Sequence, residues 1–159
     1  MGLDAVVYCD CFETGKLKEI PLFFDEIFVT ADGSLDCKSE DMETILEFDQ
    51  WCLDRACNHE NGVKIHHYIG NIALVSLLHR EISREENKFD LILNKILYSG
   101  THAGDYLEIK VVRQIQRELL HLSELVCSDK RSQDFVNYFC QQLNELVNES
   151  LKVNKPISF

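Results

Sequence analysis

Cysteine and histidine residues gather in the segment CNHENGVKIHH, which spans residues 57–67. It offers Cys57, His59, Glu60, His66 and His67 within eleven positions. Such side chains ligate zinc, and a thiol beside an imidazole is also the pairing of cysteine nucleophiles. Structural zinc sites usually combine two close ligand pairs, one of them Cys-x2-4-Cys, and this segment has no such cysteine pair. We therefore interpret the histidines as structural or exposed residues and expect no metal ion.

A second cysteine pair, Cys9 and Cys11, is too closely spaced for a redox Cys-x-x-Cys motif. On a strand these two thiols share one face with Ala5 and Val7, and we assign them to core packing. The chain has 7 cysteines, an odd number, and its 159 residues are too many for a disulfide-stapled miniprotein. Reduced thiols are therefore expected.

The segment YSGTHAGDYLE, residues 98–108, connects two expected helices and carries hydroxyls, a histidine and an acid. The amides at the start of the second helix are suited to an anion, but a carboxylate at Asp105 opposes phosphate there. The glycines match neither a Walker loop nor a dinucleotide loop. We interpret the segment as an ordered elbow between helices, with a partner-binding or ligand-binding loop as the alternative.

Together the two segments define a candidate polar patch of unassigned role. Its members are His59, Glu60, His67, Ser99, Thr101, His102 and Asp105. A hydrophobic helix and its antiparallel partner lie between the two segments in the sequence. Because such a helical hairpin brings the end of the second helix back near the start of the first, His67 and His102 are expected to lie close together. We assign no catalytic residue and expect no cofactor.

The elements that position these residues divide the chain into a β part and a helical part. Residues 5–12 alternate as a strand does, and residues 27–31 and 34–37 flank the hairpin signal Asp32-Gly33. Residues 63–67 form a short strand or an extended connection, and on a strand His66 and His67 point to opposite faces. From Ser39 onward apolar residues recur at helical spacing. The expected helices cover about 39–57, 69–84, 88–98, 105–126 and 132–152, with a frayed tail after Lys152.

This pattern predicts an α+β fold in which short N-terminal antiparallel strands or a hairpin pack on a bundle of four to five helices. The strands are expected before about residue 38. The spacing of Asp105 and Glu108 predicts a capping box at the start of one long helix. Because the chain has 2 prolines and lacks a Ser/Gly-rich linker, we expect one domain over residues 1–159.

The chain is acidic, with 27 Asp and Glu against 16 Lys and Arg and a formal charge of −11. This charge repels phosphate backbones and anionic lipid headgroups and attracts basic proteins, although acidity also keeps a small domain soluble. The start MGLDAVVYCD lacks the features of a secretory leader, and apolar runs such as IALV are too short to span a bilayer. We expect a cytoplasmic protein with no nucleic-acid or membrane partner.

The start MGLDAVVYCDCFETGKL, the segment CNHENG…HHYIGNIALV and the segment YSGTHAGDYL together resemble a family of small bacterial proteins of unassigned function. This resemblance covers residues 1–125 and transfers no catalytic residue. In size and acidity the chain also resembles the immunity proteins that neutralise bacterial toxins.

The leading hypothesis is a non-enzymatic acidic binding protein, immunity-like or regulatory, that recognises a basic protein partner. Its acidic surface, with the elbow at residues 98–105, would face that partner. The alternative is a small metal-dependent hydrolase or ligand-binding protein that uses His59, Glu60, His67 and His102.

Overall fold

The computed structural model describes residues 2–159, and it combines helices with antiparallel strands. The helices are α1 (Met42–Gln50), α2 (Ile72–Ile82), α3 (Ile109–Glu124) and α4 (Lys130–Val153). The strands are β1 (Gly2–Tyr8), β2 (Ile27–Val29), β3 (Leu35–Cys37), β4 (Val63–Asn71), β5 (Tyr106–Leu107) and β6 (Ile157–Ser158). Short 3-10 and π turns connect them. The predicted α+β class is confirmed.

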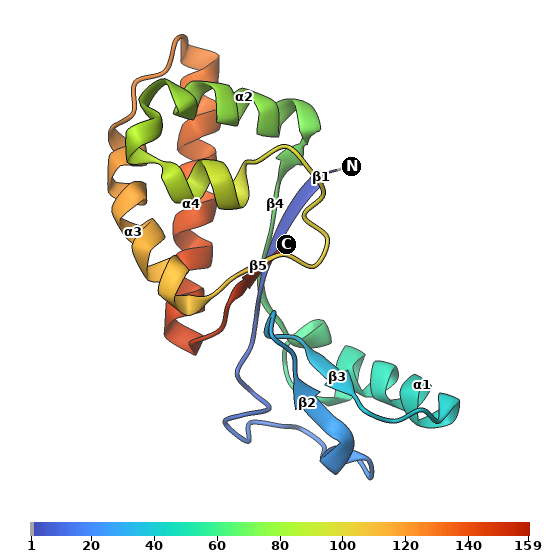
Figure 1. Ribbon diagram of the computed structural model, residues 1–159. Coiled ribbons are helices and arrows are strands. Elements are labelled where there is room, and N and C mark those ends of the chain that lie inside the picture. The colour runs from blue at the N-terminus through green and yellow to red at the C-terminus, as the bar shows by residue number, and fades with distance from the viewer. Residues whose placement is uncertain (1) are drawn as a thin grey trace.

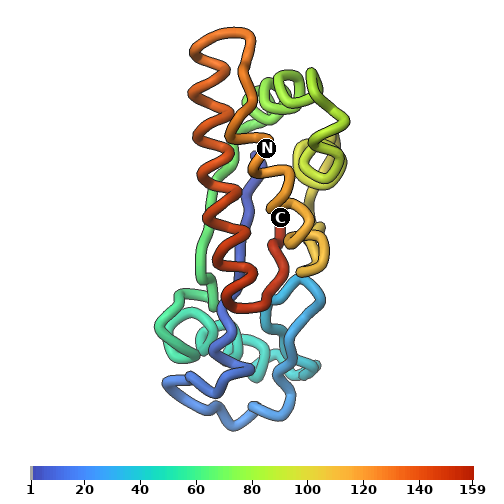
Figure 2. The backbone as a smooth tube through the Cα atoms, turned by 90° about the vertical axis from the view of Figure 1, so that its left-hand side faces the viewer, coloured from blue at the N-terminus to red at the C-terminus, as the bar shows by residue number. Residues whose placement is uncertain are grey.

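The chain forms a body and a small lobe, which Figures 1 and 2 show at opposite ends of an elongated molecule. The body holds a four-stranded sheet of order β4-β1-β6-β5, with α2, α3 and α4 on one side of it. The small lobe, residues 9–62, holds the separate β2-β3 hairpin and α1. In the sequence the small lobe is inserted between β1 and β4, and these two strands pair with each other in the sheet.

The sheet is apolar on the side that faces the helices. Leu3, Ala5 and Val7 of β1 are each at most 4% exposed, whereas Asp4 between them is exposed. This alternation is what a strand with one covered face requires. The helices complete the core mainly with aliphatic residues that recur at helical spacing, such as Val112, Ile115, Leu119 and Leu122 in α3.

The small lobe has a separate and smaller core that is rich in aromatic rings. Its buried residues are Phe23, Ile27, Phe48, Trp51 and Ala56. The Trp51 indole nitrogen donates a hydrogen bond to the Glu19 carbonyl at 3.0 Å, which ties the preceding loop onto this core. The chain thus has two hydrophobic cores, and the single domain expected over residues 1–159 stays a prediction.

Two residues of the C-terminal segment, Lys155 and Ser158, join the small lobe to the body. The Lys155 ammonium is 4% exposed and contacts both Glu13 at 2.5 Å and the Gly33 carbonyl at 3.2 Å. The Ser158 hydroxyl donates to Asp32 at 3.2 Å, so the tip of the β2-β3 hairpin rests on β6. Burial alone would raise the pKa of Asp32, but hydrogen bonds from Thr30, Ser34 and Ser158 more than offset it and lower that pKa.

Several expected boundaries in the N-terminal half are wrong. The first strand ends at Tyr8 and not at Phe12, and the hairpin loop spans residues 30–34 where a two-residue turn was predicted. Helix α1 begins after Asp41, which accepts a hydrogen bond from the Thr44 amide at 2.9 Å, and not at Ser39. Residues 63–71 form a full strand, so strands also occur well after residue 38.

In the C-terminal half, two short strands and a shortened helix differ from the prediction. The predicted capping box is wrong, because α3 begins at Ile109 and residues 106–107 form β5. The expected helix over 88–98 is shorter than predicted: it consists of a π turn at Ile92–Ile96, preceded by two helical residues, 90 and 91. The tail expected to fray instead forms β6, with Ile157 fully buried. Among residues 2–159, no helix combines the length and the apolar character needed to cross a membrane.

Candidate metal centre

Three thiols and one imidazole meet where the small lobe joins the sheet. Cys9 and Cys11 follow the end of β1, and Cys57 and His59 precede the start of β4. The potential ligand atoms of these four residues all lie within 4.8 Å of one another. We refer to Cys9, Cys11, Cys57 and His59 as the Cys3His cluster.

The backbone on each side of the cluster turns sharply, and the two turns are hydrogen-bonded to each other. The Cys9 amide donates to the Gly62 carbonyl at 2.7 Å, which extends the β1-β4 ladder by one step. Gly62 donates to the His59 carbonyl at 3.0 Å and has φ 68°, a left-handed conformation that favours glycine. Pairing of the two strands therefore brings Cys9 and Cys57 together.

The distances within the cluster match those of a tetrahedral zinc site. Zinc–sulfur bonds of about 2.3 Å and zinc–nitrogen bonds of about 2.0–2.1 Å place tetrahedral ligands about 3.8 Å (S···S) and about 3.5 Å (S···N) apart. The Cys9 and Cys57 sulfurs are 3.8 Å apart. The His59 Nδ1 atom lies 3.5 Å from the Cys11 sulfur and 3.7 Å from the Cys57 sulfur. These three distances suit one zinc ion, and all four potential ligand atoms lie within 4.8 Å of one another.

The cluster is mostly shielded from solvent. Cys11 and Cys57 are 7% and 5% exposed, and the other two members are half-buried. Burial raises the pKa of the Cys9 thiol to about 12 and also raises the pKa of the Cys11 thiol. Burial, and next the nearby Lys64, lower the pKa of His59, which keeps its imidazole neutral and able to ligate a metal.

The Lys64 side chain and the His59 backbone amide lie beside the potential ligand atoms. Zinc with three thiolates and a neutral imidazole carries a net charge of about −1. The Lys64 ammonium lies 3.5 Å from His59 Nε2 and supplies a compensating positive charge. The His59 amide donates to the Cys57 sulfur at 3.4 Å, a contact that favours the thiolate.

The structure divides the candidate polar patch that the sequence suggested. His59 belongs to the Cys3His cluster, and Glu60 is exposed on the turn that follows it. His67 lies on the covered face of the sheet opposite Ala5, with its Nε2 2.8 Å from Glu145 of α4. His66 points to the other face and contacts Asp4 at 2.8 Å, as expected for adjacent residues of a strand.

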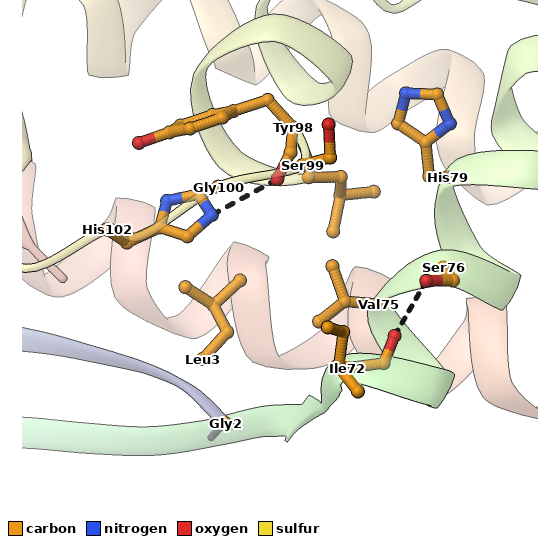
Figure 3. A pocket seen from close by; sticks show the side chains of 11 residues that line it. Gly2, Leu3, Ile72, Val75, Ser76, His79, Tyr98, Ser99, Gly100 and His102 are labelled. Atoms are coloured by element: carbon orange, nitrogen blue, oxygen red, sulfur yellow. Dashed lines mark hydrogen bonds between the residues drawn. The ribbon is translucent and has the colours of Figure 1, made fainter.

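The remaining patch residues belong to the elbow at residues 98–105. The Tyr98 hydroxyl donates to the Asp105 carboxylate and lies 3.0 Å from the Thr101 carbonyl, and the His102 ring packs 4.1 Å from the Tyr98 ring. Ser99 and His102 also line a cavity of about 310 Å³. Figure 3 shows this cavity between α2, the start of β1 and the elbow, with both aliphatic and polar side chains around it. The contacts of His67 and His102 thus involve different groups, and their proximity stays a prediction.

Cys9 and Cys11, which were assigned to core packing, are potential ligands, whereas Cys57 and His59 had been weighed as ligands only within their own segment. The signal was two short pairs, Cys-x-Cys and Cys-x-His, each placed beside a strand. A search restricted to longer ligand spacings passes over it. Pairing of β1 with β4 brings the ligand pair Cys9 and Cys11 to the ligand pair Cys57 and His59, which neither local segment provides alone.

Comparisons with known proteins gave no match: the chain matches no family model, no curated protein and no solved structure.

Proposed function

We propose that this chain is a non-enzymatic zinc-binding protein whose Cys3His cluster holds one zinc ion, and that the metal orders the small lobe for recognition of a basic protein. The observation that carries the proposal is the convergence of four ligand atoms within 4.8 Å from two turns about 48 residues apart in sequence. Three sulfurs and one imidazole nitrogen are a ligand set typical of structural zinc.

The small size of the lobe core supports a structural role for the metal. Five buried residues form that core, and small cores of this kind commonly need a metal or a disulfide for stability. All seven cysteines carry free thiols. A metal therefore supplies the cross-link between the two turns, and free thiols support the proposal of a cytoplasmic setting.

A hydrolytic role is less well supported than a structural one. Catalytic zinc keeps one position open for water, whereas four protein ligands fill a tetrahedral sphere. His67 and His102, which the hydrolase alternative needs, contact groups other than the cluster. The acidic composition, with a formal charge of −11, supports recognition of a basic protein.

Elemental analysis of the protein, purified without an affinity tag from zinc-supplemented cells, tests the metal site. We expect about one zinc per chain. Cys57→Ser should lose the metal because it removes one thiolate, while Cys140→Ser, a half-buried cysteine of α4 outside the cluster, should keep it. Cobalt substitution should give the intense visible bands of a tetrahedral thiolate complex in the wild type and in Cys140→Ser, but not in Cys57→Ser. If wild-type protein holds no more zinc than the Cys57→Ser variant, the proposal is wrong.

A further inference from the structure

Helix α1 carries an exposed apolar stripe on the side opposite the lobe core. Its members are Met42, Leu46 and Leu53, which are 68%, 62% and 42% exposed. Their spacings of four and seven residues place them on one face, because the helical turn continues through residues 51–55. Figure 1 shows α1 at the outer edge of the small lobe, away from the body.

The stripe cannot be buried by rotation of the helix. The opposite face of α1 carries Phe48, and the following turn carries Trp51, which are 7% and 0% exposed in the lobe core. Turning the stripe inward would expose both rings and lose the apolar burial that they have in the lobe core. The stripe is therefore a fixed surface feature.

Acidic side chains accompany the stripe. The segment from Ser39 to Asp54 contains six acidic residues and no Lys or Arg, and one base flanks it at each end: Lys38, and Arg55, which contacts Asp54 at 3.8 Å. Glu43, Glu47 and Asp54 are exposed and share a flank of the helix, again at spacings of four and seven. The surface thus combines an apolar row with a row of carboxylates.

This combination selects among possible occupants. In a symmetric pair of chains the same acidic flank would appear on both sides of the contact, which disfavours a second copy. An anionic lipid surface would be repelled. An amphipathic helix fits, since its apolar face can cover the stripe while its Lys or Arg residues pair with the carboxylates.

We infer that the stripe Met42, Leu46 and Leu53 is a docking surface for a basic amphipathic helix of a protein partner. The inference rests on the proposed function in one respect: the chain runs from α1 through Ala56 directly to the ligands Cys57 and His59, so the metal holds the helix in place. It assigns the recognition surface to the small lobe and not to the elbow at residues 98–105.

Fluorescence anisotropy of zinc-loaded protein tests the surface with a labelled model peptide. The peptide is an amphipathic helix of about four turns built from leucine and lysine. Two control peptides accompany it. The first has the same composition with leucine and lysine interspersed, and it tests the need for an amphipathic helix. The second has glutamate in place of lysine, and it tests the need for positive charge. We expect binding of the leucine and lysine amphipathic helix only, and weakening of that binding between about 0.05 M and about 0.5 M salt.

Two matched pairs of variants locate the binding. Leu46→Ser with Leu53→Ser should raise the peptide Kd at least about tenfold, because the apolar contact is lost. Leu120→Ser with Val126→Ser, two residues 70% and 77% exposed elsewhere, should leave it unchanged. Glu43→Gln with Glu47→Gln should weaken binding about fivefold at low salt only. The exposed acids Glu124 and Asp134 provide the charge control as Glu124→Gln with Asp134→Asn.

The outcomes separate this inference from the proposed function. Equal effects of the stripe variants and their controls, or no binding by zinc-loaded protein, would overturn the docking surface and leave the metal site standing. A dimer that dissociates on Leu46→Ser, or competition by zwitterionic lipid vesicles, would also overturn it in favour of another occupant. Unchanged peptide binding by wild-type protein that contains no zinc would overturn only the part of the proposed function in which the metal orders the small lobe.

Discussion

The protonation of the thiols determines when the Cys3His cluster can bind a metal. Zinc binds thiolate, and in the metal-free protein burial raises the pKa of Cys9 to about 12 and raises that of Cys11. Both residues are therefore thiols near neutral pH and must release a proton when the metal enters. Burial, and next the nearby Lys64, lower the pKa of His59, which favours the neutral imidazole that ligates a metal.

Zinc affinity should therefore rise steeply with pH around neutrality. With at least the protons of Cys9 and Cys11 displaced, the association constant increases by about 100-fold or more for each pH unit until the thiols begin to ionise. Competition with a chelator of known affinity at each pH measures this dependence. A pH-independent affinity between pH 6 and 8, on the order of one unit either side of neutrality, would show that the thiols are not ligands.

The sequence supported His59 as a site residue but assigned Cys9 and Cys11 to core packing. That assignment assumed a strand to Phe12, in which alternating residues share a face. The strand ends at Tyr8, and the following turn, with the Lys16 amide bonded to the Cys11 carbonyl at 2.8 Å, directs both thiols toward His59. Strand ends are set by tertiary pairing, which local alternation does not encode.

At the scale of elements, β6 is short but central in the sheet. It lies between β1 and β5, with Val6 opposite Ser158 and Leu107 opposite Ile157. Ile157 is fully buried in the body core. Two residues thus connect the N-terminal strand to the segment that precedes α3.

We expect Ile157→Ala to lower the free energy of unfolding by about 2–4 kcal/mol, because it leaves a cavity in the body core. Ile72→Ala, at a position 74% exposed at the start of α2, should change it by less than about 0.5 kcal/mol. Urea unfolding followed by far-ultraviolet circular dichroism compares the two. Equal losses for both variants would contradict the central role of β6.

The elbow illustrates why β5 and β6 were not predicted. Asp105 and Glu108 have the spacing of a capping box, which is a local signal. In the structure the Asp105 carboxylate accepts from the Tyr98 hydroxyl, and the Asp105 carbonyl accepts from the Phe159 amide at 2.9 Å. Sheet pairing with the distant C-terminal segment therefore replaces the first turn of the expected helix.

At the scale of the whole molecule, the two cores provide separate reporters. The chain has 1 tryptophan, Trp51, and it lies in the core of the small lobe. Most of the helical residues lie in α3 and α4 of the body. Tryptophan fluorescence therefore follows the lobe, and the helical circular dichroism signal follows mainly the body.

Removal of zinc by a chelator should shift the Trp51 emission to longer wavelength, because the lobe core opens to water, while most of the helical signal remains. Adding zinc back should restore the emission. The Cys140→Ser variant, which keeps the cluster, should respond as the wild type does. Loss of both signals together would show that the lobe and the body form one cooperative unit.

The class of the fold was predictable from the change of apolar spacing near Ser39, and so were the amphipathic helices that became α3 and α4. The sheet order β4-β1-β6-β5 was not, because it joins residues 2–8 with 63–71 and with 157–158. The Cys3His cluster depends on that same pairing. Long-range strand contacts thus explain both the missed topology and the missed ligands.

The point where the small lobe leaves the sheet makes it an insertion in a β-hairpin. Tyr8 and Val63 are opposite each other at the end of the β1-β4 ladder, so a two-residue turn can bridge the gap that residues 9–62 now span. The ends of the lobe are therefore as close as a hairpin turn requires, so the lobe could be replaced by such a turn or grafted into another hairpin, at the loss of its contacts with Lys155 and Ser158 of the body.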